Sequence, residues 1–346
     1  MSINHSWKKT LFAVIKIAIS IAILTLLYRK AQDGNQFSEI AQTEKNWTWI
    51  VVALFLCAAA HLISFYRWRI LVNALEVPFT TLEAVRIGLI GSAFGLVSLG
   101  VVGGDSLRVV FAARDAKNKL AQIFGSVFVD RAIGLLTMFT FATGAYLLID
   151  IGIGEADGSK KLSAIQLLCS IVSAATLAGW AVVLGFLLSP RLLGSRFVEK
   201  LKQLPKVGAI FQKLTDVVLL YRKQIPTLAY CLLLSIIVNL CFIATIYLIA
   251  IGLNVAHPSL DKHFLIAPIS MCANAVPLPG GIGGMEPVLA FLHDTLSGAG
   301  ETAKHGIVVA FCFRVTLLVV AALGAVAWFV NRKQIRSIVK EAEQDE

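Results

Sequence analysis

Three arginines and three carboxylates lie within or beside stretches of the chain that are otherwise apolar. They are Asp105, Arg108, Asp130, Arg131, Glu286 and Arg314. A guanidinium group can bind a phosphate through two parallel hydrogen bonds. These residues therefore predict a site for an anionic headgroup, in which the carboxylates balance the arginines or bind a cationic headgroup.

A structural ion pair is the alternative explanation of Arg131. Asp130 is adjacent in sequence, but neighbouring side chains on a helix point in different directions, so Asp130 is a poor partner. Asp105 and Glu286 are better candidates as partners of the arginines, although each could equally be a plain helix cap.

Two glycine-rich motifs precede or include these carboxylates. Gly103-Gly104-Asp105 and Gly283-Gly284-Met285-Glu286 each predict a tight turn followed by the start of a helix. The residues expected at hairpin turns are Gly103, Gly104, Pro277, Pro279, Gly280, Gly281, Gly283 and Gly284.

The composition determines which elements must position these groups. The chain has 346 residues, of which 57% are hydrophobic and only 15% charged. This composition excludes an ordinary soluble enzyme and a disordered chain. A helix needs about 20 apolar residues to cross a bilayer. Six stretches qualify, at about 10–28, 47–66, 121–149, 164–188, 226–253 and 306–330.

Two further apolar stretches, 85–104 and 266–292, are interrupted by glycine and proline and predict re-entrant hairpins. The expected fold is an all-α polytopic membrane protein, with six transmembrane helices plus two re-entrant hairpins in an inverted repeat. The parts are a single membrane domain (1–330, with halves at about 10–150 and 164–330) and a charged cytoplasmic tail (331–346).

The basic residues predict the orientation. Segment 191–223 holds eight lysines and arginines against two carboxylates, so it is expected in the cytoplasm. The same topology puts the N- and C-termini in the cytoplasm and assigns Arg67 and Arg69 to an inner loop. The first helix is expected to stay uncleaved, because no small-x-small cleavage site follows it. The net charge of +10 is then explained by topology and contact with anionic lipid, without a nucleic-acid partner.

Other chemistry is sparse. The six cysteines all lie in apolar stretches and are expected to be small buried residues without disulfides. His61 is expected to be a satisfied core histidine, and four outer-loop histidines lack the spacing of metal ligands. No metal site and no cofactor is expected.

The two glycine motifs, together with Val129-Asp130-Arg131, resemble the lysylphosphatidylglycerol synthase transmembrane family over roughly residues 10 to 330. Ser98 stands where this family is expected to have proline. The resemblance implies a flippase-like domain of a bacterial inner membrane. The soluble synthase domain of the full-length family members is expected to be absent, and the chain is not expected to be an enzyme.

The expected function is a lipid translocase whose partners are membrane lipids with anionic headgroups. Arg131 and Arg314 would hold the lipid phosphate, with Arg108 assisting from the cytoplasmic side. Two alternatives stay open: a membrane-embedded transferase using Asp105, Asp130 or Glu286, and a secondary transporter of a small anionic solute. The sequence leaves open whether the protein forms a homo-oligomer.

Overall fold

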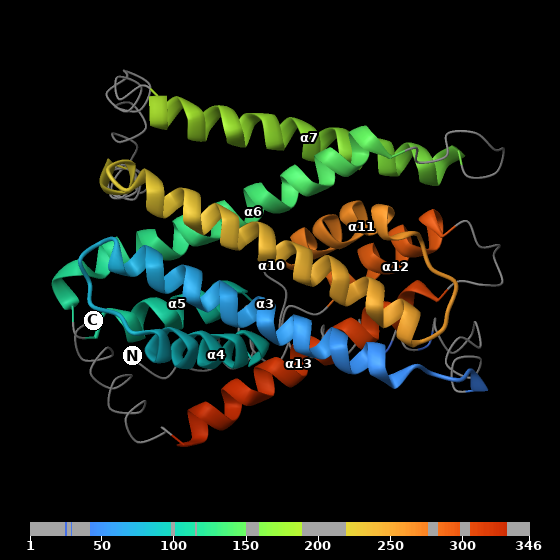
Figure 1. The fold of residues 1–346 in the computed structure, drawn as a ribbon, viewed down its shortest axis with the longest axis horizontal. Helices are drawn as coiled ribbons and strands as arrows, with labels where there is room; N and C mark the ends of the chain where they lie inside the picture. Colours follow the sequence, from blue (N-terminus) through green and yellow to red (C-terminus); the bar gives the residue numbers. More distant parts are fainter. Residues whose placement is uncertain are drawn as a thin grey trace, which may run out of the picture.

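The computed structural model is built of helices packed side by side (Figure 1). The structure describes residues 25, 29, 42–97, 101–114, 116–149, 159–188, 219–275, 283–297 and 305–330. Every regular element in these ranges is helical, which confirms the expected all-α class.

The described helices fall into long and short ones. The long helices are α3 (Trp47–Asn73), α6 (Leu120–Leu148), α7 (Ser159–Leu188), α10 (Ile225–Gly252) and α13 (Gly306–Val330). The short ones form two pairs, here named the first hairpin, α4 (Thr81–Val97) with α5 (Val101–Ala112), and the second hairpin, α11 (Leu260–Cys272) with α12 (Met285–Leu296). Short 3-10 turns occur at Lys117–Lys119 and Ala273–Ala275.

Five of the helices that the structure describes are long and apolar enough to cross a membrane. Their candidate spans are Trp47–Asn73, Leu120–Leu148, Leu162–Gly185, Ile225–Gly252 and Gly306–Val326. Five of the six predicted spans are thus found as helices. The first predicted span, about 10–28, lies almost entirely outside the described residues.

Helices α3 and α10 lie side by side and run in opposite directions. The backbone N–H of Asn46, just before α3, donates to the carbonyl of Gly252 at the end of α10, at 2.8 Å. At the other end, the Tyr221 hydroxyl, shortly before α10, donates to the carbonyl of Leu71 near the end of α3. The C-terminal ends of α3 and α10 therefore lie at opposite ends of the bundle (Figure 1).

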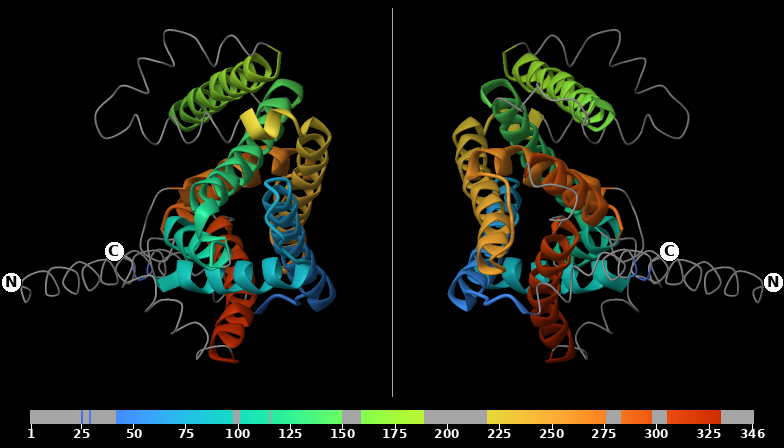
Figure 2. Two further views of the ribbon diagram at one scale, coloured as in Figure 1. Left: turned by 90° about the vertical axis from the view of Figure 1, so that its left-hand side faces the viewer. Right: turned by 90° about the vertical axis from the view of Figure 1, so that its right-hand side faces the viewer.

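Each hairpin follows one of these two helices and packs against a long helix from the other part of the chain. The first hairpin follows α3, and its helix α4 packs against α13. The second hairpin follows α10, and its helix α11 packs against α6. Because α3 and α10 are antiparallel, the two hairpins enter the bundle from opposite ends. Helix α7 lies at the margin, where it packs mainly on α6 (Figures 1 and 2).

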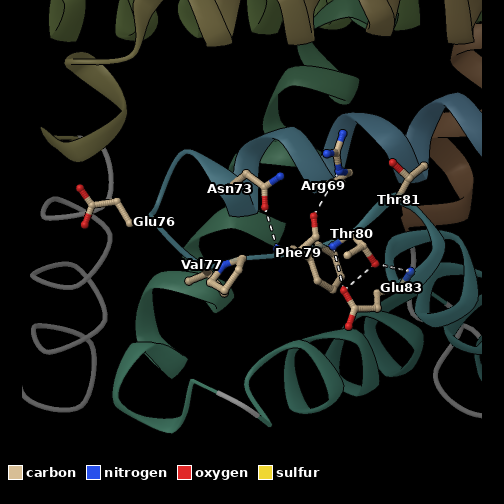
Figure 3. Close-up of a pocket in the computed structure, with 9 residues that line it drawn as sticks. Arg69, Asn73, Glu76, Val77, Phe79, Thr80, Thr81 and Glu83 are labelled. Carbon is tan, nitrogen blue, oxygen red and sulfur yellow. Dashed lines mark hydrogen bonds between the residues drawn. The ribbon is translucent and has the colours of Figure 1, made fainter.

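The connection from α3 to α4 is held by local hydrogen bonds (Figure 3). The Asn73 side chain accepts the backbone N–H of Phe79, and Arg69 Nε donates to the Phe79 carbonyl at 3.1 Å. Thr80 and Glu83 exchange side-chain to backbone hydrogen bonds at the start of α4. This reciprocal capping box satisfies free N–H groups of the first turn. It fixes where the first hairpin begins.

Two glycines allow the first hairpin to pack closely. A Cβ atom on Gly104 of α5 would collide with the backbone oxygen of Gly91 on α4. A Cβ atom on Gly324 of α13 would collide with the backbone oxygen of Leu89 on α4. These close approaches bring α5 and α13 onto opposite sides of α4.

We predict that Gly324→Ala destabilises the protein by about 1–3 kcal/mol, because the added methyl group forces α13 away from α4. The matched control is Gly144→Ala on α6, where a Cβ atom would meet nothing within 4 Å. The control is expected to be neutral or more stable by up to about 1 kcal/mol, since alanine favours a helix. Thermal unfolding in detergent micelles measures both changes, and equal midpoints for the two variants would contradict the prediction.

Candidate functional site

The first arginine–carboxylate pair joins the first hairpin to α6. Arg131 on α6 donates Nε and Nη2 to the two carboxylate oxygens of Asp105 on α5, at 2.7 and 2.6 Å. This is the bidentate geometry of a strong guanidinium–carboxylate pair. The Arg131 side chain is nevertheless 42% exposed. Its Nη1 makes no hydrogen bond to the residues described, so one edge of the guanidinium group is left open there.

Arg108 lies one helical turn beyond Asp105 and is buried but loosely held. Its Nη1 donates to Asp105 at 3.3 Å, and its Nη2 reaches the Gly88 carbonyl at 3.3 Å and the Ser92 hydroxyl at 3.4 Å. These are long hydrogen bonds, and Arg108 Nε has no partner in the described ranges. The guanidinium group also lies 5.2 Å from the ring centre of Phe65.

The second pair joins the second hairpin to α13. Arg314 on α13 donates Nε to Glu286 on α12 at 2.5 Å, and its Nη2 donates to the Asn274 side chain at 3.3 Å. The other oxygen of Glu286 accepts the backbone N–H of Gly283 at 2.9 Å. Glu286 is fully buried, and the Arg314 side chain is 8% exposed. This pair is closed off from its surroundings.

The two pairs occupy equivalent places in the chain. Each carboxylate lies near the start of the second helix of a hairpin, and each arginine lies on the long helix that follows, 26 or 28 residues later. The structure thus brings Asp105, Arg108 and Arg131 together in one group and Glu286 with Arg314 in another. The difference between the pairs is exposure: the first is open and the second is closed.

Asp130 belongs to neither group. Its carboxylate accepts Nε of Arg67 on α3 at 2.8 Å, and its backbone oxygen accepts Nη2 of the same arginine. Arg67 Nη1 donates to the Ser235 hydroxyl on α10. Both charged side chains are nearly fully buried. The pair ties α3, α6 and α10 together and leaves Asp130 inaccessible to a ligand in this structure.

Arg67 was not among the residues predicted for the site. The predicted span ended at Tyr66, which placed Arg67 in an inner loop, whereas α3 continues to Asn73 and Arg67 is buried in it. The physical reason is the pairing with Asp130, which makes a charge tolerable inside the bundle. The apolar residues Trp68, Ile70 and Leu71 after Arg67 were the signal that the helix continues.

The residues predicted to form hairpin turns lie in different kinds of structure. Gly283 and Gly284 do lie in the turn before α12, and Gly283 has a positive φ of 93°. Gly103 and Gly104, in contrast, lie inside α5, which begins at Val101, so the prediction of a turn there is wrong. Their small size instead allows α5 to approach α4. The other four expected turn residues lie outside the described residues: Pro277, Pro279, Gly280 and Gly281.

The remaining candidate chemistry is limited. All six cysteines have free thiols and are buried or half-buried. Among the described residues, no group of three or more histidine, cysteine or carboxylate side chains could hold a metal ion.

A bundle of long apolar helices with paired charges in its interior defines a multi-pass membrane protein. Residues 13–324 match the family described as the lysylphosphatidylglycerol synthase TM region, and the chain belongs to this family. The resemblance drawn from the sequence motifs is thereby confirmed. Neither a curated protein nor a solved structure matches the chain.

We predict that Arg67→Met destabilises the protein by about 3–5 kcal/mol, because it leaves the Asp130 carboxylate buried without its partner. Adding Asp130→Leu removes the unpaired charge and is expected to restore most of the stability. Thermal unfolding of the purified variants in detergent provides the measurement. A double variant no more stable than Arg67→Met would show that the pair has a different role.

Proposed function

We propose that this protein is an integral membrane lipid translocase, with no enzymatic activity, that moves a lipid with an anionic headgroup between the two leaflets. The chain belongs to a family named after a lipid-modifying synthase, which supports a function that involves membrane lipids. The observation on which the proposal rests is the bidentate Asp105–Arg131 pair, whose arginine keeps one edge of its guanidinium group open. A guanidinium edge of this kind suits a phosphate oxygen.

The proposed architecture has six spans, the first at about 10–28, and two re-entrant hairpins in an inverted repeat. The antiparallel arrangement of α3 and α10 supports it, as does the entry of the two hairpins from opposite ends of the bundle. The equivalent positions of the Asp105–Arg131 and Glu286–Arg314 pairs support it further. In such repeats, the ligand site lies between the two halves.

The proposed location is a bacterial inner membrane, with both termini in the cytoplasm. The end of the bundle at which α3 ends and α6 begins carries Arg69, Arg114 and Lys119. This excess of basic residues favours the cytoplasmic side for that end. Asp261, at the start of α11, lies at the opposite end, which is then the outer side.

In the proposed mechanism, the lipid phosphate binds the open edge of Arg131 while the acyl chains stay in the bilayer. The loosely held Arg108 adds a second positive group beside it. The closed Glu286–Arg314 pair blocks the equivalent place in the other half. Rocking of one half against the other would then open the second pair and close the first, which gives alternating access.

The orientation predicts which residues react with a reagent that cannot cross the membrane. We expect a cysteine introduced at the exposed Arg114 to be labelled by a membrane-impermeant maleimide only after the membrane is permeabilised. A cysteine introduced at Asp261 is expected to react in intact spheroplasts. The native cysteines lie in apolar stretches, and a wild-type control measures their background. The reverse pattern would overturn the proposed orientation.

The arginine variants test the translocation itself. We expect Arg131→Gln to slow the movement of fluorescent phosphatidylglycerol across proteoliposome membranes by about tenfold or more, since one lost charge-assisted hydrogen bond costs about 1.5–3 kcal/mol. Arg314→Gln would leave Glu286 buried and unpaired, so the double variant Glu286→Gln/Arg314→Gln is used instead. We expect it to fold and to be equally slow.

The matched control is Arg114→Gln, an exposed arginine at the end of the first hairpin, which is expected to translocate lipid at the wild-type rate. Wild-type rates for Arg131→Gln would refute the role of this arginine. Uptake of free phosphate without movement of lipid would instead identify a transporter of small anions.

A further inference from the structure

Two histidines are fully buried in the second hairpin, near the end of the bundle proposed as the outer side. Both were expected in outer loops, whereas His263 lies on α11 and His293 on α12, and neither side chain has exposed surface. Their rings meet edge to face, with 6.2 Å between the ring centres. The ring of Tyr247 on α10 packs against His263 at 5.1 Å and against His257, in the segment before α11, at 5.4 Å. The fold thus gathers three histidines around one tyrosine.

Three of the four ring nitrogens of the buried pair lack a hydrogen bond to the residues that the structure describes. Nδ1 of His263 lies 3.0 Å from the carbonyl oxygen of Ser259, and because a carbonyl only accepts, this nitrogen carries the hydrogen. Nε2 of His263 is then an acceptor without a partner in those ranges, and both nitrogens of His293 are also without one. Buried polar atoms are normally satisfied. A proton is a ligand that imidazole nitrogens bind near neutral pH.

Asp261 and Lys262 are the charged neighbours of His263 on α11. Asp261 is exposed at the start of the helix, where water weakens its field. Lys262 donates Nζ to the carbonyl of Leu296 at 2.9 Å, which ties the start of α11 to the end of α12. A proton on His263 would therefore add a second positive charge next to Lys262. The N–H that it creates at Nε2 would have no acceptor among the described residues.

Asp294 is the carboxylate next to His293 on α12. Its Oδ1 lies 3.8 Å from Nδ1 of His293, beyond hydrogen-bond distance, and accepts the backbone N–H of Gly306 at 2.7 Å. The titratable residue before Gly306 is His305, which is half-buried. Asp294 is thus already engaged with the start of α13. A charged imidazole in this buried place costs free energy, so a proton favours an arrangement in which water reaches the two rings.

The buried face of α12 connects this histidine pair to the second arginine–carboxylate pair. Glu286 and His293 are seven residues apart, about two turns, and both are fully buried. Leu289, between them on the same face, is fully buried as well. A movement of α12 that lets water reach His293 therefore also moves Glu286, about 10 Å away along the same helix. The hydrogen bond from Arg314 to Glu286 depends on that position.

We propose that the His263–His293 pair is a proton-binding site: a proton taken up from water on the outer side separates α12 from α11 and opens the closed Glu286–Arg314 pair. For its effect on transport, this inference rests on the proposed function, to which it adds a coupling ion. A hydrated imidazole has a pKa of about 6.5. The closed form is therefore favoured above about pH 6.5 and is lost progressively as the pH falls below that value.

Hydrogen exchange of backbone amides measures this opening without any transport. The full chain in lipid nanodiscs is compared at about pH 7.5 and about pH 5.5, on either side of the pKa of a free histidine, with rates corrected for intrinsic exchange. We expect the opening of α12 to increase about tenfold at the lower pH, since one hydrated imidazole gains its proton over this range. The double variant His263→Asn/His293→Asn binds no proton there and is expected to lose this response.

A second double variant, His263→Phe/His293→Phe, keeps the ring contact and is expected to lose the response too. The matched control is His61→Asn, because Nδ1 of His61 likewise lies 2.8 Å from a carbonyl one turn earlier, that of Cys57. This control is expected to keep the wild-type response of α12. Equal protection of α12 at the two pH values in the wild type, or an unchanged response in both double variants, would overturn the proton site.

Transport separates this inference from the proposed function. In proteoliposomes, acidifying the surrounding buffer is expected to speed the movement of fluorescent phosphatidylglycerol by the wild type by up to about tenfold, and to leave the double variants unchanged. A pH response of α12 without any movement of lipid would refute the proposed translocation and leave the proton site standing. Movement of lipid at the same rate at both pH values would refute the coupling of the proton to transport.

Discussion

The cost of placing a charge inside an apolar bundle is the constraint on which this structure depends. A guanidinium group there must be paired or must face a wet cavity. Arg67, Arg131 and Arg314 each meet this requirement by pairing with a carboxylate on a different helix. Each pair consequently fixes the packing of two helices. Asp105–Arg131 holds the first hairpin to α6, Glu286–Arg314 holds the second hairpin to α13, and Arg67–Asp130 holds α3 to α6.

The three pairs differ in how many hydrogen-bond donors of the arginine they leave unused. Arg67 uses Nε, Nη1 and Nη2, so the pair with Asp130 is complete and acts as structure. Arg131 binds Asp105 with one edge and keeps the other edge open. Residue type alone does not distinguish these cases, since all three are arginine–carboxylate pairs in apolar surroundings. The number of donors in use and the exposure of the side chain do distinguish them.

The helices were predictable from sequence because their signal is local: a run of apolar residues of sufficient length identifies a span wherever it packs. The arginine–carboxylate pairs were predictable only in part. Asp105 and Glu286 were candidates as arginine partners because each hairpin has one of them, although each could equally have been a plain helix cap. Arg67 lies 63 residues from Asp130, and its charge was mistaken for the end of a span. Gly103 and Gly104 were misplaced for a related reason. A glycine that permits a close helix contact and a glycine in a turn have the same identity, and only the position of Gly91 in space separates them.

The carboxylate beside Arg131 also has a consequence for transport. An unpaired arginine in the bundle would be costly and would bind a phosphate tightly, whereas a transporter must bind its ligand weakly enough to release it. Asp105 already occupies two donors of Arg131 and one of Arg108, so a phosphate at the open edge of Arg131 would bind beside a carboxylate that repels it. Under the proposed function, the carboxylate would thereby lower the affinity for the anion, and it offsets part of the positive charge of the empty site. In the proposed mechanism, the same pairing that allows Arg131 to be inside the bundle would set how strongly it holds a lipid phosphate.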